Sequence, residues 1–145
     1  MPASKVSVIG GGSFGTVLAN IAAQNGYDVM FWMRSSQVVD DVNRQHQNPQ
    51  YLPGYELNRK VVASIDMQVA VADSDIIFVA VPSSSFRQVV KSVAAHAPER
   101  AMLVSTTKGI EAGTFKLMSQ ILTEELPRAR VGVLSGPNLA KVIAS

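Results

Sequence analysis

The chain has 145 residues, 47% hydrophobic and 17% charged, a balance that excludes a disordered polypeptide and suits one domain with a buried core. Thirteen basic and eleven acidic residues give a net charge of +2, too small and too scattered to indicate nucleic-acid binding. There is no cysteine and no apolar run of 18 residues, so we expect no disulfide, thiolate metal site or membrane span. We interpret His46 and His96 as solvated, and with no room for a signal peptide we expect a cytoplasmic protein.

The first predicted strand, residues 5–9, leads directly into the turn Gly10-x-Gly12-x-x-Gly15. Apolar residues then recur at helical spacing from Phe14 to Ala22, and Gly26 provides a stop. A glycine triplet alone is weak evidence, since such turns also occur simply to bend the chain. In this context, however, Gly10 allows a tight turn, Gly12 lets phosphates approach the backbone, and Gly15 lets the helix pack closely. Strand, turn and helix together predict a dinucleotide pyrophosphate site at the helix N-terminus.

The next segments continue the alternation. Residues 28–33 predict a second buried strand, and Ser35 or Ser36 should cap a helix whose apolar face includes Val38 and Val42. The periodicity then stops from 47 to 60, where prolines and glycines predict an ordered loop. A short strand at 61–64 and a weak helix at 67–71 follow.

The strongest strand after the first covers residues 76–81, and its uniformly apolar sequence predicts a central parallel strand that is covered on both faces. Pro82 should end it, and Ser85-x-x-Gln88 predicts a capping box for a helix that runs to Pro98. The remaining predicted elements are a strand at 102–105, a helix that includes Phe115 and ends before Pro127, a strand at 131–134, and a short helix at 139–144.

Strand–helix alternation without a repeat or linker predicts an α/β fold, a single domain with a Rossmann-type, doubly wound, mostly parallel sheet. In such sheets, ligands bind outside the carboxyl ends of the strands. The turns that follow the strands should therefore carry the chemistry, and they lie at 10–15, 34–36, 82–85, 106–109 and 135–138.

The turn after the second strand bears on the choice of cofactor. Sites that prefer NAD place an acidic residue there to bind the ribose 2′-hydroxyl, whereas this chain has Met33, Arg34 and two serines. A guanidinium and hydroxyls suit a 2′-phosphate, which favours NADP(H), with NAD(H) as the alternative. The alternative interpretation of Arg34 is an ordinary exposed arginine.

Other candidates have structural alternatives. Lys108 is suited to attract an anionic substrate or to bind near a nicotinamide, but a lone lysine is commonly a solvated surface residue. Asn138 offers polar groups near the same edge, or a cap for the last helix. Trp32 and Phe86 are most simply core residues, and Phe86 has a second interpretation as a wall of the cofactor cleft.

Four motifs give the chain a resemblance to a known family. They are Gly10-Gly-Gly-Ser-Phe-Gly-Thr16, Tyr51-Leu-Pro-Gly54, Thr107-Lys-Gly-Ile-Glu111 and Ser135-Gly-Pro-Asn-Leu-Ala-Lys141. In order and spacing, the chain resembles bacterial NAD(P)-dependent glycerol-3-phosphate dehydrogenase. The resemblance implies reversible hydride transfer between NAD(P)H and dihydroxyacetone phosphate, which gives sn-glycerol 3-phosphate for phospholipid synthesis.

The resemblance also implies site residues. Cofactor contacts fall on the glycine turn and on Ser13, Phe14, Arg34, Lys108 and Ala140. Substrate contacts fall on Lys108, Gly136 and Asn138. Two departures are Asn138, where many members have serine or threonine, and Val142, where a glutamate often stands.

Members of this family continue into a helical domain that supplies the general acid/base lysine and most phosphate-binding groups. We therefore expect that lysine beyond Ser145, and residues 1–145 to be the cofactor-binding domain alone, with no catalytic residue of its own. The full-length protein is expected to be a homo-oligomer. Two alternatives stay open. One is a non-catalytic NAD(P)-binding or redox-sensing module, and the other is a two-domain dehydrogenase acting on a different hydroxy acid or sugar acid.

Overall fold

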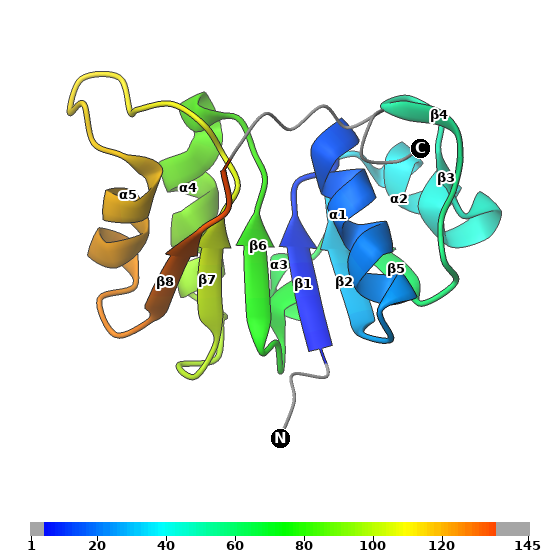
Figure 1. Cartoon of the computed structure of the whole chain (residues 1–145), viewed down its shortest axis with the longest axis horizontal. Helices are drawn as coiled ribbons and strands as arrows, with labels where there is room; N and C mark the ends of the chain where they lie inside the picture. Colours follow the sequence, from blue (N-terminus) through cyan, green and yellow to red (C-terminus); the bar gives the residue numbers. More distant parts are fainter. Residues whose placement is uncertain (1–4, 136–145) are drawn as a thin grey trace.

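A computed structural model describes residues 5–135 as alternating strands and helices (Figure 1). The order and bounds are β1 (Lys5–Ile9), α1 (Ser13–Gln24), β2 (Asp28–Trp32), α2 (Ser36–Gln45), β3 (Gln47–Asn48), β4 (Leu52–Glu56), β5 (Val61–Ser64), α3 (Met67–Val71), β6 (Ile76–Val79), α4 (Ser83–Ala94), β7 (Met102–Ser105), α5 (Met118–Glu125) and β8 (Arg130–Val133).

Six of the strands form one sheet in the order β5-β2-β1-β6-β7-β8, and every neighbouring pair is parallel. The sheet order reverses between β1 and β6, which is the switch point where doubly wound sheets bind ligands. The predicted fold class, a Rossmann-type parallel sheet, is confirmed, and the carboxyl ends of β1, β2, β6 and β7 meet along one edge.

The two faces of the sheet carry separate cores. Alternate residues of β1 point to opposite faces, so Val6 and Val8 pack with α1 and α2, while Ile9 packs with α3, α4 and α5. Fully buried aromatic rings lie in each core, Phe31 on the α1 side and Phe86 on the α4 side. In Figure 1, α1 lies in front of the sheet and α4 behind it.

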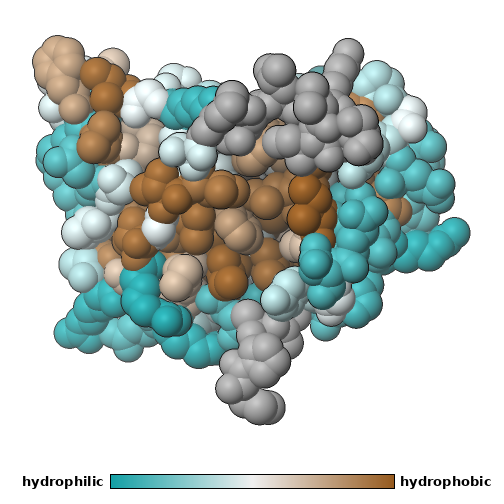
Figure 2. Space-filling model, in the orientation of Figure 1, coloured by the Kyte–Doolittle hydropathy of each residue, from teal (hydrophilic) through white to brown (hydrophobic). Residues whose placement is uncertain are grey.

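Strand β6 is central, as predicted, but residues 5–135 cover only one of its faces completely. Ile77 and Val79 are buried under α4, whereas Ile76 and Phe78, on the face that carries α1, are only partly buried. Figure 2 shows the resulting apolar surface over the β6–β8 half of that face. Within the described residues, the prediction of cover on both faces is therefore wrong for this half of the sheet.

Several predicted helix ends are confirmed. Ser35 is the N-cap of α2, and its Oγ accepts a hydrogen bond from the N–H of Val38 at 3.3 Å. Helix α1 ends at Gln24, and Gly26 follows with a φ of +94°.

Several predicted boundaries are wrong, among them the end of the strand predicted at 76–81, since β6 ends at Val79. The 47–60 segment contains the antiparallel pair β3–β4, which a period-based prediction misses because the strands are short and hold a proline and a glycine. Helix α4 begins at Ser83 with Pro82 as N-cap, so the predicted Ser85 capping box does not form, and Ser85 Oγ instead donates to the Pro82 carbonyl. Phe115 precedes α5, with a φ of +59° and 75% of its surface exposed.

Candidate functional site

The glycine turn joins the carboxyl end of β1 to α1 by close backbone packing. A Cβ on Gly15 would lie 2.1 Å from the Gly10 carbonyl oxygen, and one on Gly10 would lie 2.3 Å from the Ala80 carbonyl oxygen. Gly10 also has a φ of +124°, which strains any residue with a side chain. These positions require glycine because the strand, the helix and the end of β6 approach one another here.

Gly12 differs from its neighbours because a Cβ there would meet no atom of the described chain within 4 Å. It is the N-cap of α1 and provides no side chain to accept the first N–H groups of the helix. Those N–H groups therefore remain as donors, reinforced by the helix dipole, at a point open to an incoming group. This is the backbone arrangement that an anionic phosphate requires.

A groove of about 500 Å³ runs over this turn toward the end of β2. The glycine turn forms its floor, and Trp32, Arg34 and Tyr51 stand among its walls. Trp32 is half in the core, and its indole N–H donates to the Ile65 carbonyl at 2.9 Å. The groove thus has a flat apolar wall beside a chain of backbone donors, which suits a nucleotide.

Arg34 is exposed at the end of β2, and within residues 5–135 no ion pair takes up its guanidinium. Ser35 stands beside it in the wall of the same groove. The position that an acidic residue would occupy for a ribose 2′-hydroxyl is thus basic in the structure as well as in the sequence.

A second hollow of about 330 Å³ continues the groove past the switch point. Phe14 and residues 80–82 line both, and Thr106, Thr107 and Lys108 close the far end. The structure therefore brings Arg34, the glycine turn and Lys108 to one continuous edge, as expected from parallel strands.

The loop that bears Lys108 is fixed to the sheet by two threonines. Thr106 Oγ1 donates to the Val79 carbonyl at 3.1 Å, and Thr107 Oγ1 donates to the Val81 carbonyl at 2.6 Å. Gly109 follows with a φ of +108° and passes over Ser83 at the start of α4. The end of β6 and the loop after β7 are therefore held together at the hollow.

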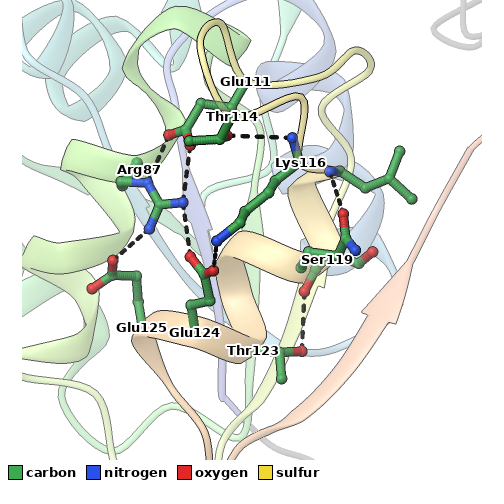
Figure 3. A network of polar contacts seen from close by, with 10 residues as sticks. Arg87, Glu111, Thr114, Lys116, Ser119, Thr123, Glu124 and Glu125 are labelled. Atoms are coloured by element: carbon green, nitrogen blue, oxygen red, sulfur yellow. Dashed lines mark hydrogen bonds and ion pairs between the residues drawn. The ribbon is translucent and has the colours of Figure 1, made fainter.

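An ion-pair network holds the same loop from the other side (Figure 3). Arg87 on α4 makes a bidentate pair with Glu111 at 2.6 and 2.9 Å, and reaches Glu124 and Glu125 on α5 at 2.8 Å each. Lys116 pairs with Glu124 in turn. The hydrogen bonds from Arg87, and then from Thr114, lower the pKa of Glu111 to about 2, while Glu111 and then Glu125 raise the pKa of Arg87.

Some of the predicted site residues cannot be placed, because the structure describes residues 5–135. Gly136, Asn138 and Ala140 lie outside the described residues, as does the end of the chain at Ser145, beyond which we expect the general acid/base lysine. The structure therefore leaves the roles of these residues and the place of that lysine as predictions.

Two aromatic residues are placed by the structure. Phe86 is fully buried in the core, so the second interpretation of it as a cleft wall is wrong. The place of Tyr51 was not predicted from the sequence, and its carbonyl accepts a 2.6 Å hydrogen bond from Ser13 Oγ. The only signal for it was the Tyr-Leu-Pro-Gly motif, since hydrophobic periodicity says nothing of contacts across 38 residues.

Two features are absent from residues 5–135. No helix there is long and apolar enough to cross a membrane. No group of three or more histidine, aspartate or glutamate side chains in that range is placed to hold a metal ion.

Comparisons with known proteins agree with this geometry. A glycerol-3-phosphate dehydrogenase [NAD(P)+] from Teredinibacter turnerae is 52% identical over 139 residues, covering 96% of this chain and 41% of that protein. The dehydrogenase structures from Coxiella burnetii and Saccharomyces cerevisiae are 29% and 33% identical, each with a TM-score of 0.88. They cover 98% and 99% of this chain, and 43% and 44% of their own.

The chain thus spans about two fifths of the length of the relatives it matches. The model of one family, described as the N-terminus of NAD-dependent glycerol-3-phosphate dehydrogenase, matches residues 5–145. Since that match covers nearly all of the sequence, the chain belongs to the family of N-terminal domains of NAD-dependent glycerol-3-phosphate dehydrogenase.

Proposed function

We propose that this chain is the NAD(P)-binding domain of a glycerol-3-phosphate dehydrogenase. The observation that carries the proposal is the continuous edge from Arg34 over the glycine turn to Lys108. A dinucleotide laid along it would place its adenosine near Arg34, its pyrophosphate on the turn and its nicotinamide toward Lys108. The open space above Gly12 fits this, because it is the space that a phosphate needs.

The residues have separate roles in this proposal. Gly10 and Gly15 shape the turn, while Gly12, Ser13 and Phe14 present their N–H groups to the phosphates. Phe14 also lines the hollow next to Lys108, where its ring would shield the nicotinamide from water. Lys108, Gly136 and Asn138 would face the substrate, and Ala140 would lie on the cofactor side.

The reaction proposed for the whole protein is interconversion of dihydroxyacetone phosphate and sn-glycerol 3-phosphate, for phospholipid synthesis. The bound dinucleotide supplies or accepts the hydride. Within this chain, the Lys108 ammonium would attract the phosphorylated substrate and orient it against the edge of the sheet. Residues 5–135 place no acid, histidine or second lysine on the walls of the hollow beside Lys108, so the proton is proposed to come from a lysine beyond Ser145.

We infer a preference for NADP(H) over NAD(H), because Arg34 and Ser35 stand where a 2′-phosphate would lie. Trp32, the single tryptophan of the chain, lines the groove and is a built-in probe, since its emission overlaps the absorption of reduced nicotinamide. Titrations with NADPH and NADH, followed by Trp32 quenching, should give a lower Kd for NADPH. Equal affinities would contradict the preference, and no binding of either would contradict the assignment.

The activity of the isolated chain is a second test. The chain should bind the dinucleotide yet show little or no oxidation of NADPH with dihydroxyacetone phosphate. Robust turnover by these 145 residues would show that the proton donor lies within the chain.

A further inference from the structure

The β3–β4 hairpin contains the Tyr-Leu-Pro-Gly motif and is an addition to the parallel sheet. Its Asn48 side chain is completely buried beneath the glycine turn. The Asn48 amide nitrogen donates to the Gly11 carbonyl at 2.9 Å and to Thr16 Oγ1 at 2.8 Å. Ser13 Oγ makes a second link, to the Tyr51 carbonyl at 2.6 Å. The β3–β4 hairpin, which has no assigned role, is therefore hydrogen-bonded to the glycine turn and to the first residues of α1.

The direction of the carbonyl groups in the turn decides whether it can bind an anion. The Gly10 carbonyl faces the α-carbon of Gly15, and the Gly12 carbonyl accepts from the N–H and Oγ1 of Thr16 at 3.0 and 2.7 Å. Both are held by α1 itself. The Gly11 carbonyl is different, because its partner, Asn48, comes from the hairpin.

The peptide between Gly11 and Gly12 needs such an external partner. It joins two residues without side chains, so no Cβ restricts rotation of the peptide plane. A Cβ at Gly12 would contact nothing, whereas one at Gly11 would lie 2.7 Å from Met33 Cβ, so the peptide is open on the groove side and packed on the other. If this peptide turned over, its carbonyl oxygen would face the groove and its N–H would point inward. A negative dipole would then replace a donor where a phosphate is expected.

The Asn48 amide is fixed in the donating orientation. Its nitrogen lies next to two acceptor atoms, and reversing the amide would place its oxygen against the Gly11 carbonyl oxygen. The Oδ1 atom, on the other side, is buried without a hydrogen-bond partner among residues 5–135. A buried oxygen without a hydrogen bond destabilises the fold, so an asparagine that served only to fill space would be a poor choice here. Its presence is explained if the site requires the N–H donors of the same amide.

We propose that Asn48 is a positioning residue for pyrophosphate binding, which holds the Gly11 carbonyl inward so that the turn presents only N–H groups to the ligand. This inference rests on the proposed function, since it needs a dinucleotide on the turn. In this proposal the hairpin supports the phosphate site by fixing the orientation of the Gly11–Gly12 peptide on the side away from the ligand.

The test compares Asn48→Asp with Asn20→Asp in the 145-residue chain. Both are buried asparagines that tie the hairpin segment to α1, but Asn20 bonds Tyr55 and Asn58, away from the turn. Both substitutions keep the side-chain shape and add one negative charge. Asn48→Leu, which adds no charge, separates loss of the donor from electrostatic repulsion. Each variant is titrated with NADPH and, by competition, with adenosine, which has no phosphate, and its thermal unfolding is recorded.

Both Asn48 variants should weaken NADPH binding by about tenfold, the equivalent of one lost hydrogen bond to a charged group. Their adenosine affinity should stay within about twofold of wild type, as should both affinities of Asn20→Asp. A parallel loss of NADPH and adenosine affinity, or an equal NADPH loss in Asn20→Asp, would show that Asn48 is only structural. If wild type bound neither NADPH nor NADH, the proposed function would fail first and take this inference with it.

Discussion

The two ends of the candidate site are built by different physics. At the glycine turn, shape comes from backbone contacts as short as the 2.1 Å that a Gly15 Cβ would make, and the ligand-facing groups are N–H dipoles. At the Lys108 loop, shape comes from side chains, with two threonine hydrogen bonds and a guanidinium shared among three carboxylates. The first end has no room for a side chain at Gly10 or Gly15, and the second depends on the charges of its side chains.

We therefore expect the glycine turn to respond to added side-chain volume, and the Lys108 loop to respond to changes in pH, salt and charge. Steric packing of backbone atoms is insensitive to pH and salt, but it leaves no room for a methyl group at Gly10 or Gly15. An ion-pair network tolerates changes of shape at the surface, but it weakens when a carboxylate is protonated. Four substitutions test this contrast, from the largest expected effect to the smallest.

Gly15→Ala should have the largest effect. The added Cβ would overlap the Gly10 carbonyl, which is backbone and has no rotamer to move, so we expect a loss of more than about 3 kcal/mol in stability. Gly12→Ala is the matched control, because its Cβ meets open space and should leave the thermal unfolding temperature near that of wild type. NADPH binding should fall in both, since a Cβ at position 12 would stand where the proposed function places the phosphate. A wild-type unfolding temperature for Gly15→Ala would refute this account of the turn.

Arg34→Ala should have the second-largest effect, which we expect on the affinity for NADPH. Charge-assisted hydrogen bonds to a 2′-phosphate are worth about 1.5–3 kcal/mol, so NADPH affinity should drop by about ten- to a hundredfold. NADH affinity should stay nearly unchanged because NADH has no such phosphate. Trp32 quenching measures both. An equal loss for the two cofactors would mean that Arg34 contacts something they share.

Glu111→Gln tests how far the ion pair between Arg87 and Glu111 contributes to stability at different pH values. The pKa of Glu111 is lowered from its ordinary value of 4.5 to about 2, so its ion pair stabilises the fold above pH 4.5 and loses that contribution as pH falls toward 2. Thermal unfolding of wild type between pH 5 and 2 should therefore show a steeper fall than that of the variant. Identical slopes would show that the Arg87–Glu111 pair contributes nothing to acid stability.

Arg128→Ala should have the smallest effect, although its pair with Glu99 is 2.9 Å long, like those of Arg87. The two side chains are 83% and 71% exposed, against 25% and 17% for Arg87 and Glu111. Exposed pairs contribute between zero and about 1 kcal/mol, so the unfolding temperature should hardly change. A loss as large as that of an Arg87→Ala variant would mean that burial does not separate the two pairs.

The sheet and the turn were readable from the sequence because their signals are local. Apolar runs such as 76–79 predict strands, and the spacing of Gly10, Gly12 and Gly15 predicts the turn, since each residue acts on its immediate neighbours. The end of β6 at Val79, the start of α4 at Ser83 and the exposed Phe115 were not predicted. Those boundaries depend on the hydrogen-bond donors and acceptors that the neighbouring strand and loop place beside them. The secondary-structure propensity of a residue does not contain that information.

Alone, therefore, the sequence determined the fold class, the glycine turn between β1 and α1 and the basic residue at the end of β2, which follow from period, glycine spacing and residue type. Only the tertiary structure decided that Asn48 and Tyr51 support the turn and that Arg87 anchors the loop of Lys108. These contacts join residues 24 to 38 positions apart. The physical reason is that buried hydrogen bonds and ion pairs are selected by position in space, and the packing of the whole sheet sets that position.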